Sequence, residues 1–256
     1  MLWAAKGGDT MNAPIITCFE RIEKKYFLTP GQYAAFRQRL TPYVRADAYG
    51  EYTICNLYYD ADDYKLIRAS IEKPVYKEKL RVRSYGVPAA DGAVFVELKK
   101  KFDGVVYKRR ITSTPRASEM LLRGIQPAGT QSQIQKEIEY FQQFHHTSPK
   151  VFIAYDRQAF QGIDNSALRI TFDRNMRYRL DRLDLRAGDD GAPILQTDNI
   201  LMEIKIPGAC PLWLAHLLTQ YGIYPTSFSK YGECYRAHIL YGNQKTMTKK
   251  EMCLSA

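Results

Sequence analysis

One short segment of the chain places cations at every second position. The sequence YKEKLRVRSY, from Tyr76 to Tyr85, contains four of them, at Lys77, Lys79, Arg81 and Arg83. On an extended strand this spacing directs all four side chains to one face, because successive side chains point to opposite sides. A wall of like charges inside a protein is unfavourable unless a polyanion lies against it. The segment therefore predicts a strand that binds a chain of phosphates.

The same alternation of charged residues recurs in other segments that look like strands. These are Arg21, Glu23 and Lys25; Glu97, Lys99 and Lys101; Arg169, Thr171 and Asp173; and Leu201, Glu203 and Lys205. Taken alone, each is also compatible with a solvated sheet face, which is the commoner fate of such a pattern. Five segments that mix cations with carboxylates on one face favour an enclosed, charged tunnel. We therefore predict an α+β fold, in which a closed antiparallel β-barrel has polar contents and an apolar exterior covered by helices.

Composition agrees with an anionic partner. The 256 residues carry 37 Lys and Arg against 27 Asp and Glu, a net charge of +10, and this leaves nucleic acid, phosphate chains and acidic membrane surfaces as candidate ligands. Five cysteines without metal-like spacing imply no disulfide framework and favour a reducing, cytoplasmic compartment. No apolar run approaches the ~20 residues of a membrane span, and no signal-peptide pattern is present, so we expect a soluble protein.

We expect one domain, residues 15–242, between a disordered N-terminal extension, residues 1–14, and a flexible C-terminal tail, residues 243–256. The pair Asp103-Gly104 separates two strand-like runs and predicts a hairpin that brings Lys99 and Lys108 to one lumen. A second hairpin is expected around residues 162–165, followed by a long rim loop over residues 174–199. Helices are expected after Thr29-Pro30, from Asp62 to Ile71, and over residues 131–145, 211–221 and 228–241.

Eight segments occur in a characteristic order along the chain: RIEKKYFL, EYTICNLYYD, EKLRVRSYG, VELKKK, YDRQAF, LRITFDRN, ILMEIKI and TSFSKYGECY. Together they resemble the VTC domain, the polyphosphate polymerase branch of the CYTH-like triphosphate tunnel metalloenzymes. The resemblance covers roughly Glu20 to Leu240, and each segment alone has only a few characteristic positions. It implies a closed tunnel of eight antiparallel strands with helices around it.

The resemblance also implies roles for individual residues. Arg81 and Arg83 match tunnel arginines that hold a nucleoside triphosphate or a phosphate chain, and guanidinium forks suit phosphate oxygens. With Lys99, Arg157 and Glu203 they would form the catalytic set. The implied phosphate- and nucleotide-binding residues are Arg21, Lys25, Lys79, Arg81, Arg83, Lys99, Lys108, Arg157, Arg169, Lys205, Ser229 and Lys230. The last two begin a helix, where free backbone N–H groups add an anion site.

A divalent metal is part of the implied site. Glu203 matches the metal-binding glutamate of the family, and its hard carboxylate suits Mn²⁺ or Mg²⁺. Many triphosphate tunnel enzymes begin with a Glu-x-Glu-x-Lys strand for metal, whereas the matching face here reads Arg21, Glu23, Lys25. Glu23 and Glu97 are consequently weaker metal candidates than Glu203.

The implied activity is that of a polyphosphate polymerase, a phosphotransferase that moves the γ-phosphoryl group of ATP onto a polyphosphate or pyrophosphate acceptor. Positioning and charge stabilisation suffice for phosphoryl transfer, so no nucleophilic side chain is expected. A triphosphatase of the same fold and a non-catalytic polyphosphate or inositol-phosphate binding module are the alternatives. Nucleic-acid binding ranks below them, because the cations alternate within strands and do not line up on a helix.

Simpler interpretations exist for several of these residues. Arg157 and Arg169 could form ordinary surface ion pairs with Asp156 or Asp173. Glu203 and Lys205 could neutralise each other. The 19 tyrosines are expected to serve the packing of barrel and helices, and not to act as platforms for stacked bases.

Overall fold

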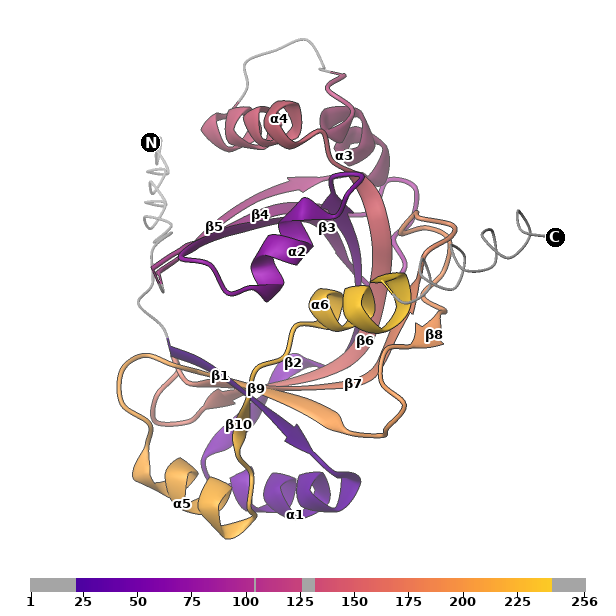
Figure 1. The fold of residues 1–256 in the computed structure, drawn as a ribbon. Coiled ribbons are helices and arrows are strands. Elements are labelled where there is room, and N and C mark those ends of the chain that lie inside the picture. The colour runs from indigo at the N-terminus through magenta and orange to yellow at the C-terminus, as the bar shows by residue number, and fades with distance from the viewer. Residues whose placement is uncertain (1–21, 104, 126–131, 241–256) are drawn as a thin grey trace, which may run out of the picture.

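The computed structural model describes residues 22–103, 105–125 and 132–240. Its strands form one antiparallel sheet in the order β10-β1-β9-β7-β6-β2-β3-β4-β5, with β8 paired to β7 beside this path. The strands are β1 (Ile22–Leu28), β2 (Val44–Asp60), β3 (Tyr76–Tyr85), β4 (Val94–Phe102), β5 (Val105–Ser113), β6 (Ser148–Gly162), β7 (Arg169–Arg179), β8 (Ala192–Pro193), β9 (Ile200–Ile206) and β10 (Pro225–Thr226). In Figure 1 the sheet curves strongly, and α2 (Lys65–Ile71) and α6 (Lys230–Cys234) lie on its concave side.

The α+β class and the antiparallel pairing are confirmed, but the closed eight-stranded barrel is wrong. The sheet has 10 strands, and within the described residues no pairing joins β5 to β1 or β10, so the sheet is open along one side. The alternation of side chains determines which residues share a face, whereas closure also depends on strand number, tilt and stagger. Moreover, β8 and β10 have two residues each, too few to show a period in the sequence.

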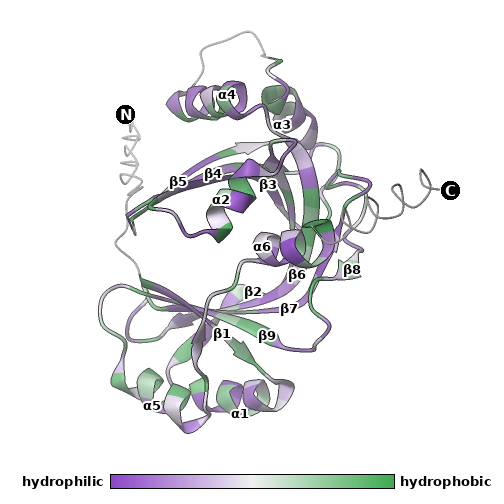
Figure 2. Cartoon of the chain, in the orientation of Figure 1, coloured by the Kyte–Doolittle hydropathy of each residue, from purple (hydrophilic) through white to green (hydrophobic). Residues whose placement is uncertain are grey.

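Two apolar layers cover the convex face of the sheet. Helices α1 (Pro30–Leu40) and α5 (Leu212–Gln220) pack on β1, β7 and β9, where Phe36 and Leu214 contact the cluster around Phe172. Helices α3 (Pro115–Leu122) and α4 (Gln133–His145) cover β3 and β4 in the same way. Figure 2 shows hydrophobic and hydrophilic residues alternating along the strands. This alternation sends the apolar side chains to the helices and leaves the charged ones on the concave face.

A third apolar cluster fills part of the concave side, which the sequence analysis did not predict. There α2 and α6 bring Ile67 and Tyr231 against Ile54 of β2. Asp60, at the end of β2, accepts hydrogen bonds of 3.0 Å from the backbone N–H groups of Leu66 and Ile67 and from the Tyr231 hydroxyl. This buried carboxylate ties α2 to α6, so only the remainder of the concave face is available to charged side chains and a ligand.

Most of the expected elements are present with shifted bounds. The hairpin at residue 103 corresponds to β4 and β5, and the second hairpin to β6 and β7. Strand β7, however, continues to Arg179, so the loop expected from residue 174 begins after it. The last helix consists of α6 followed by a π-helical stretch, Tyr235–Leu240. The expected extension, residues 1–14, and tail, residues 243–256, lie outside the described residues. Among the described helices, none is both long and apolar enough to span a bilayer.

Candidate functional site

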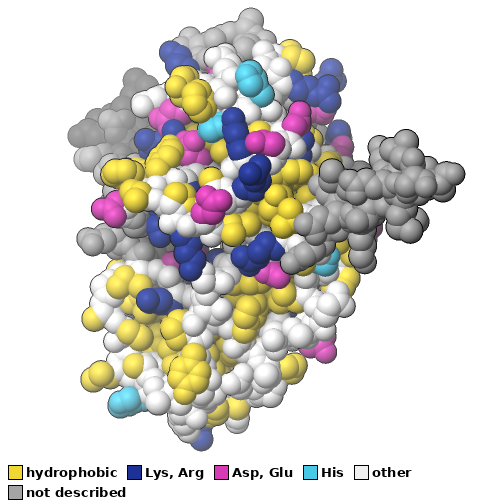
Figure 3. Space-filling model, in the orientation of Figure 1, with side chains coloured by type: hydrophobic (Ala, Val, Ile, Leu, Met, Phe, Trp, Pro, Cys, Tyr) yellow, Lys and Arg dark blue, Asp and Glu magenta, His cyan; other side chains and the backbone are white. Residues whose placement is uncertain are grey.

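The charged faces of seven strands, β1, β3, β4, β5, β6, β7 and β9, meet on the concave side of the sheet. Strand register places Arg81 opposite Glu97, Lys79 opposite Lys99, and Lys99 opposite Lys108. The prediction that Lys99 and Lys108 face one interior agrees with this register. Figure 3 shows Lys and Arg side chains gathered across the middle of the molecule, between its upper and lower parts.

Glu97 is the centre of the first charged group, the Glu97 cluster, which consists of Glu97, Arg81, Arg83, Lys108 and Arg110. The side chain of Glu97 is 1% exposed. Arg81 donates to Glu97 Oε2 from Nε at 2.8 Å and from Nη2 at 2.7 Å, and Lys108 Nζ and Arg110 Nε each lie 2.8 Å from Oε1. Burial alone would raise the pKa of Glu97, but Arg81, Arg83 and Lys108 hold it well below its usual range. One carboxylate therefore fixes several cations in place.

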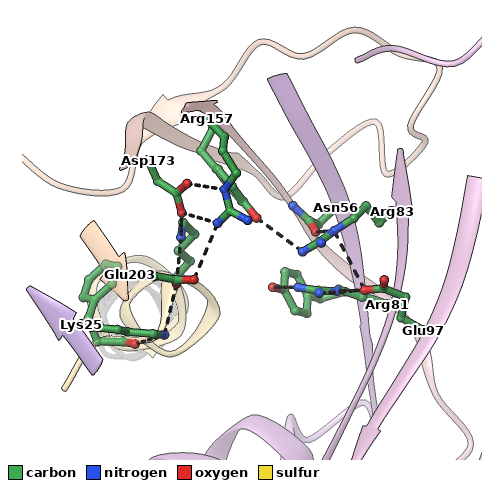
Figure 4. A network of polar contacts seen from close by, with 12 residues as sticks. Lys25, Asn56, Arg81, Arg83, Glu97, Arg157, Asp173 and Glu203 are labelled. Atoms are coloured by element: carbon green, nitrogen blue, oxygen red, sulfur yellow. Dashed lines mark hydrogen bonds and ion pairs between the residues drawn. The ribbon is translucent and has the colours of Figure 1, made fainter. Parts of the chain in front are cut away.

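Arg83 is held in a different way from Arg81 (Figure 4). Its Nε donates to Asn56 Oδ1 at 3.0 Å, and its Nη2 donates to the Tyr155 hydroxyl at 3.4 Å. Glu97 Oε2 is 3.9 Å from Arg83 Nε, whereas the same oxygen accepts from two nitrogens of Arg81. Because two of its partners are neutral, Arg83 keeps more uncompensated positive charge than Arg81. It is therefore the better placed of the two arginines to bind a phosphate.

A second charged group, the Asp173 cluster, lies across the concave face and consists of Asp173, Glu203, Arg157, Lys230 and Lys25. Asp173 is fully buried and binds Arg157 Nε at 2.6 Å, Arg157 Nη2 at 2.8 Å and Lys230 Nζ at 2.6 Å. Glu203 lies farther from its cations, 3.5 Å from Lys25, 3.7 Å from Arg157 and 3.8 Å from Lys230. Burial raises the pKa of Glu203, but Lys230, Lys25 and Arg157 together lower it. Glu203 is thus ionised with its oxygens only loosely engaged.

A third group has cations alone. We call Lys77, Lys79 and Lys99 the lysine cluster, because they lie on adjacent strands of the concave face and, within the described residues, none of them forms an ion pair with a carboxylate. Lys79 Nζ donates to Ser229 Oγ at 3.2 Å, and this hydroxyl carries no charge. Burial, followed by repulsion from Lys25, Lys99 and Lys77, lowers the pKa of Lys79 to about 7. The cluster therefore has positive charge that the protein itself does not neutralise.

We expect the affinity for inorganic tripolyphosphate to fall as the pH rises above about 7. In the free protein Lys79 loses its proton near pH 7, whereas a bound polyanion favours the charged form and raises the pKa of Lys79 in the complex. Binding then takes up a proton at pH values between the two pKa values, so the affinity declines as the pH rises through that range. Calorimetric titrations at about pH 6 to 9, in buffers of different ionisation enthalpy, measure the affinity for tripolyphosphate and the number of protons taken up on binding.

The matched variant is Lys79→Arg, because arginine stays charged over this whole range. The groups that face this position are Lys25, Lys77, Lys99, Arg81 and Ser229, and they are the same in both proteins. The variant is expected to lose the proton uptake that depends on Lys79. Equal proton uptake in both proteins would assign the effect to the phosphates of the ligand and contradict the prediction.

The remaining predicted residues border these groups. Lys205 lies on the concave face next to Glu203, and burial lowers its pKa. Ser229 begins α6, where its hydroxyl accepts a hydrogen bond from the backbone N–H of Gly232 at 3.2 Å. Arg169 is exposed, at the start of β7 and opposite Lys205. Glu23 is also opposite Lys205 and exposed. Arg21 lies outside the described residues.

Sequence reasoning missed three residues that contact the predicted residues of the candidate site. Arg110 follows Lys108 by two positions on β5 and was not among the residues predicted to bind phosphate. Its alternation with Lys108 was the signal that could have identified it. Asn56 and Tyr155, which hold Arg83, are uncharged, so the search for alternating charges could not find them.

The carboxylates do not form a preformed metal cage. Within the described ranges, no three His, Cys, Asp or Glu residues are grouped so that they could hold a metal ion. Glu97 already has cations on both oxygens, which makes it a poor metal ligand. Glu203 is more suitable, since its nearest cations are at least 3.5 Å away. Mg²⁺ and Mn²⁺ are often held by one or two carboxylates together with substrate phosphates and water, and Glu203 fits that arrangement.

Comparisons with solved structures and with families complete the description. One match is a proposed adenylate cyclase from Vibrio parahaemolyticus, with 14% sequence identity and a TM-score of 0.49, over 83% of this chain and 96% of that chain. Another is a Pyrococcus horikoshii protein, with 11% identity and a TM-score of 0.40, over 83% of this chain and 96% of that chain. A third match is a proposed adenylyl cyclase from Hippeastrum, described as having a dominant triphosphatase activity. It has 16% sequence identity and a TM-score of 0.49, over 85% of this chain and 95% of that chain. No curated protein matches the chain. The family comparison matches residues 20–239 to the VTC domain, and this chain therefore belongs to the VTC domain family.

Proposed function

We propose that this chain is a polyphosphate polymerase, which transfers the γ-phosphoryl group of ATP to the end of a polyphosphate chain on the concave face of its sheet. Its membership of the VTC domain family supports a function in phosphate-chain chemistry. The observation that carries the proposal is the lysine cluster, whose charges lack carboxylate partners within the described structure. A ligand with negative charges spaced along a chain would neutralise these lysines and also reach the two neighbouring clusters.

The proposed reaction has a simple balance of bonds. An oxygen of the terminal phosphate of the acceptor, polyphosphate or pyrophosphate, forms a bond to the γ-phosphorus of ATP. The bond from that phosphorus to the β,γ-bridging oxygen breaks, and ADP leaves with its electron pair. Charge in the transition state is spread over the phosphoryl oxygens, where fixed cations stabilise it without any covalent step on the protein.

The charged clusters suggest how the roles are divided. Arg83 would contact the transferred phosphoryl group, while Arg81, held by Glu97, and Lys99 would stabilise the neighbouring oxygens. Arg157, held by Asp173, would act from the opposite wall. The residues that would hold the rest of the phosphate chain are Lys25, Lys79, Lys108, Arg169, Lys205, Ser229 and Lys230. A divalent ion such as Mn²⁺ or Mg²⁺, when bound, supplies further charge neutralisation, and Glu203 would be its carboxylate ligand.

Product analysis tests the proposal. The purified protein is incubated with ATP and Mn²⁺ or Mg²⁺, and nucleotides and phosphate chains are resolved separately. ADP together with a ladder of lengthening phosphate chains is the expected result. ADP with free phosphate and no ladder would identify a triphosphatase, because water would then have replaced the acceptor. Tight binding of polyphosphate without turnover would identify a binding module.

A cytoplasmic location belongs to the same proposal. Cys55, Cys210 and Cys234 are free thiols in the structure, and thiols are kept reduced in the cytosol. Nucleic acid is not an expected partner, because the uncompensated cations lie on the concave face among acidic groups and not along an exposed helix.

A further inference from the structure

Four aromatic side chains form a continuous row at the rim of the concave face, and we call them the aromatic row. Its members are Tyr49 and Tyr52 of β2, Tyr85 of β3 and Phe95 of β4. Neighbouring ring centroids are 6.1 Å, 5.9 Å and 5.7 Å apart in this order, each pair in an edge-to-face arrangement. The guanidinium of Arg110 lies 4.4 Å from the centroid of the Phe95 ring. Five side chains from four strands are thereby connected.

The row is exposed, unlike an aromatic cluster that serves only to pack the core. Tyr49 is 79% exposed and Tyr85 is 52% exposed. An irregularity in the pairing of β2 with β6 presents Tyr49, where Gly50 has a φ of +64° and Asp47 accepts a hydrogen bond from the Tyr49 backbone N–H at 3.1 Å. The other oxygen of Asp47 accepts a hydrogen bond from the Tyr52 hydroxyl at 3.4 Å. The rings are thus held in place while aromatic surface stays open to solvent.

The aromatic row borders the charged clusters directly. Tyr85 follows Arg83 by two residues and therefore lies on the same face of β3. Phe95 precedes Glu97 by two residues on β4 in the same way, and Arg110 contacts both Phe95 and Glu97. A separation of two residues along a strand is about 7 Å. Flat aromatic surface is consequently found within one side-chain spacing of the candidate phosphate-binding arginine.

We propose that the aromatic row is the nucleoside subsite of the protein. The base of the nucleoside triphosphate stacks on Tyr85 and Tyr49, its ribose spans the step along β3, and its phosphates reach Arg83 and the cations beyond. Stacking suits a nucleobase because every base has a flat π-face, and Arg110 adds a cation beside the stacked rings. Inorganic phosphate chains lack a base and bind without this contact.

This inference rests on the proposed function. A comparison of two ligands tests the nucleoside subsite separately from that function. Dissociation constants for ATP and for inorganic tripolyphosphate are measured by calorimetry on the wild-type protein and on Tyr85→Ala. The variant is expected to bind ATP about tenfold more weakly, because loss of one stacking partner has an effect of that order, and to bind tripolyphosphate with an affinity within about twofold of the wild type. Tyr85→Phe, which keeps the ring, is expected to restore ATP binding.

Two further variants complete the design. Tyr49→Ala removes a ring that is 79% exposed, so it tests the same subsite even if Tyr85→Ala fails to fold. Tyr140→Ala is the matched control, since Tyr140 is 66% exposed and stacked on Phe144, but lies on α4 over the convex face. An equal effect of the rim variants on ATP and tripolyphosphate, or no effect on either, would overturn the nucleoside subsite and leave the proposed function standing. A wild-type protein that binds neither ligand would overturn both.

Discussion

The Glu97→Gln variant is expected to lose about 3 kcal/mol of unfolding free energy, measured by urea denaturation without ligand. Removing the carboxylate leaves Arg81, Lys108 and Arg110 close together without their shared partner. Loss of one partner of a buried ion pair costs about 3–5 kcal/mol, and the lower end applies because Lys108 is 44% and Arg110 34% exposed, so water relieves part of the repulsion. Inorganic tripolyphosphate is expected to restore part of the stability, since it supplies the missing negative charge.

Glu119→Gln is the matched control. Glu119 pairs with Arg123 on the exposed surface of α3, and its loss should change the unfolding free energy by no more than about 0.5 kcal/mol. If Glu97 served instead as a metal ligand, its neutral variant would be as stable as the wild type in the absence of metal. Equal stability of Glu97→Gln and wild type would therefore reject its role as the anchor of the arginines.

The Arg83→Ala variant is expected to turn over ATP roughly 10²–10³ times more slowly, the effect of removing one preorganised donor from a phosphoryl-transfer site. Arg83 combines a buried position with neutral partners on two nitrogens, so its charge is available to the ligand. Arg83→Lys should recover only part of the rate, because an ammonium group cannot reproduce the planar fork. Initial rates of ADP release under saturating ATP provide the measurement.

Arg109→Ala tests whether the effect is specific to the concave face. Arg109 is on β5 between Lys108 and Arg110, but it points to the convex side and pairs with Glu137 of α4 at 3.0 Å. This variant should retain at least about half of the wild-type rate, since its ion pair with Glu137 lies on the face of the sheet away from the charged clusters. Comparable losses in Arg83→Ala and Arg109→Ala would indicate that net charge, and not position, governs activity.

The concave site could be predicted from the sequence because a strand has a period of two residues. Once Lys79, Arg81 and Arg83 alternate, any sheet that buries the intervening Leu80 and Val82 must place the cations together. The hairpin at Asp103 then fixes β5 beside β4 and brings Lys108 opposite Lys99. Local rules of this kind determine which side chains share a face, and they were sufficient to predict that these arginines and lysines of β3, β4 and β5 share one.

Other features depend on contacts between segments that are distant in sequence. The third apolar cluster on the concave side forms because α6 packs against β2 and α2, which are more than a hundred residues away in the sequence. The periodicity of a single segment does not predict such a contact. The ion pairs of Glu97 also depend on pairing between strands, because its partners lie on β3 and β5, on either side of β4. Tyr85 of the aromatic row lies in an ordinary strand position and only its exposure distinguishes it from a packing residue, whereas Tyr49 depends on an irregularity in the pairing of β2 with the distant β6.

The openness of the sheet has a consequence for how molecules of this protein behave toward one another. A strand with one free side can add a strand from a second molecule and begin aggregation. Among the described strands β5 has only β4 as a neighbour, and it carries three successive cations, Lys108, Arg109 and Arg110. Two such strands would repel each other on approach, so the basic sequence that we associate with ligand binding also protects the free side from self-association.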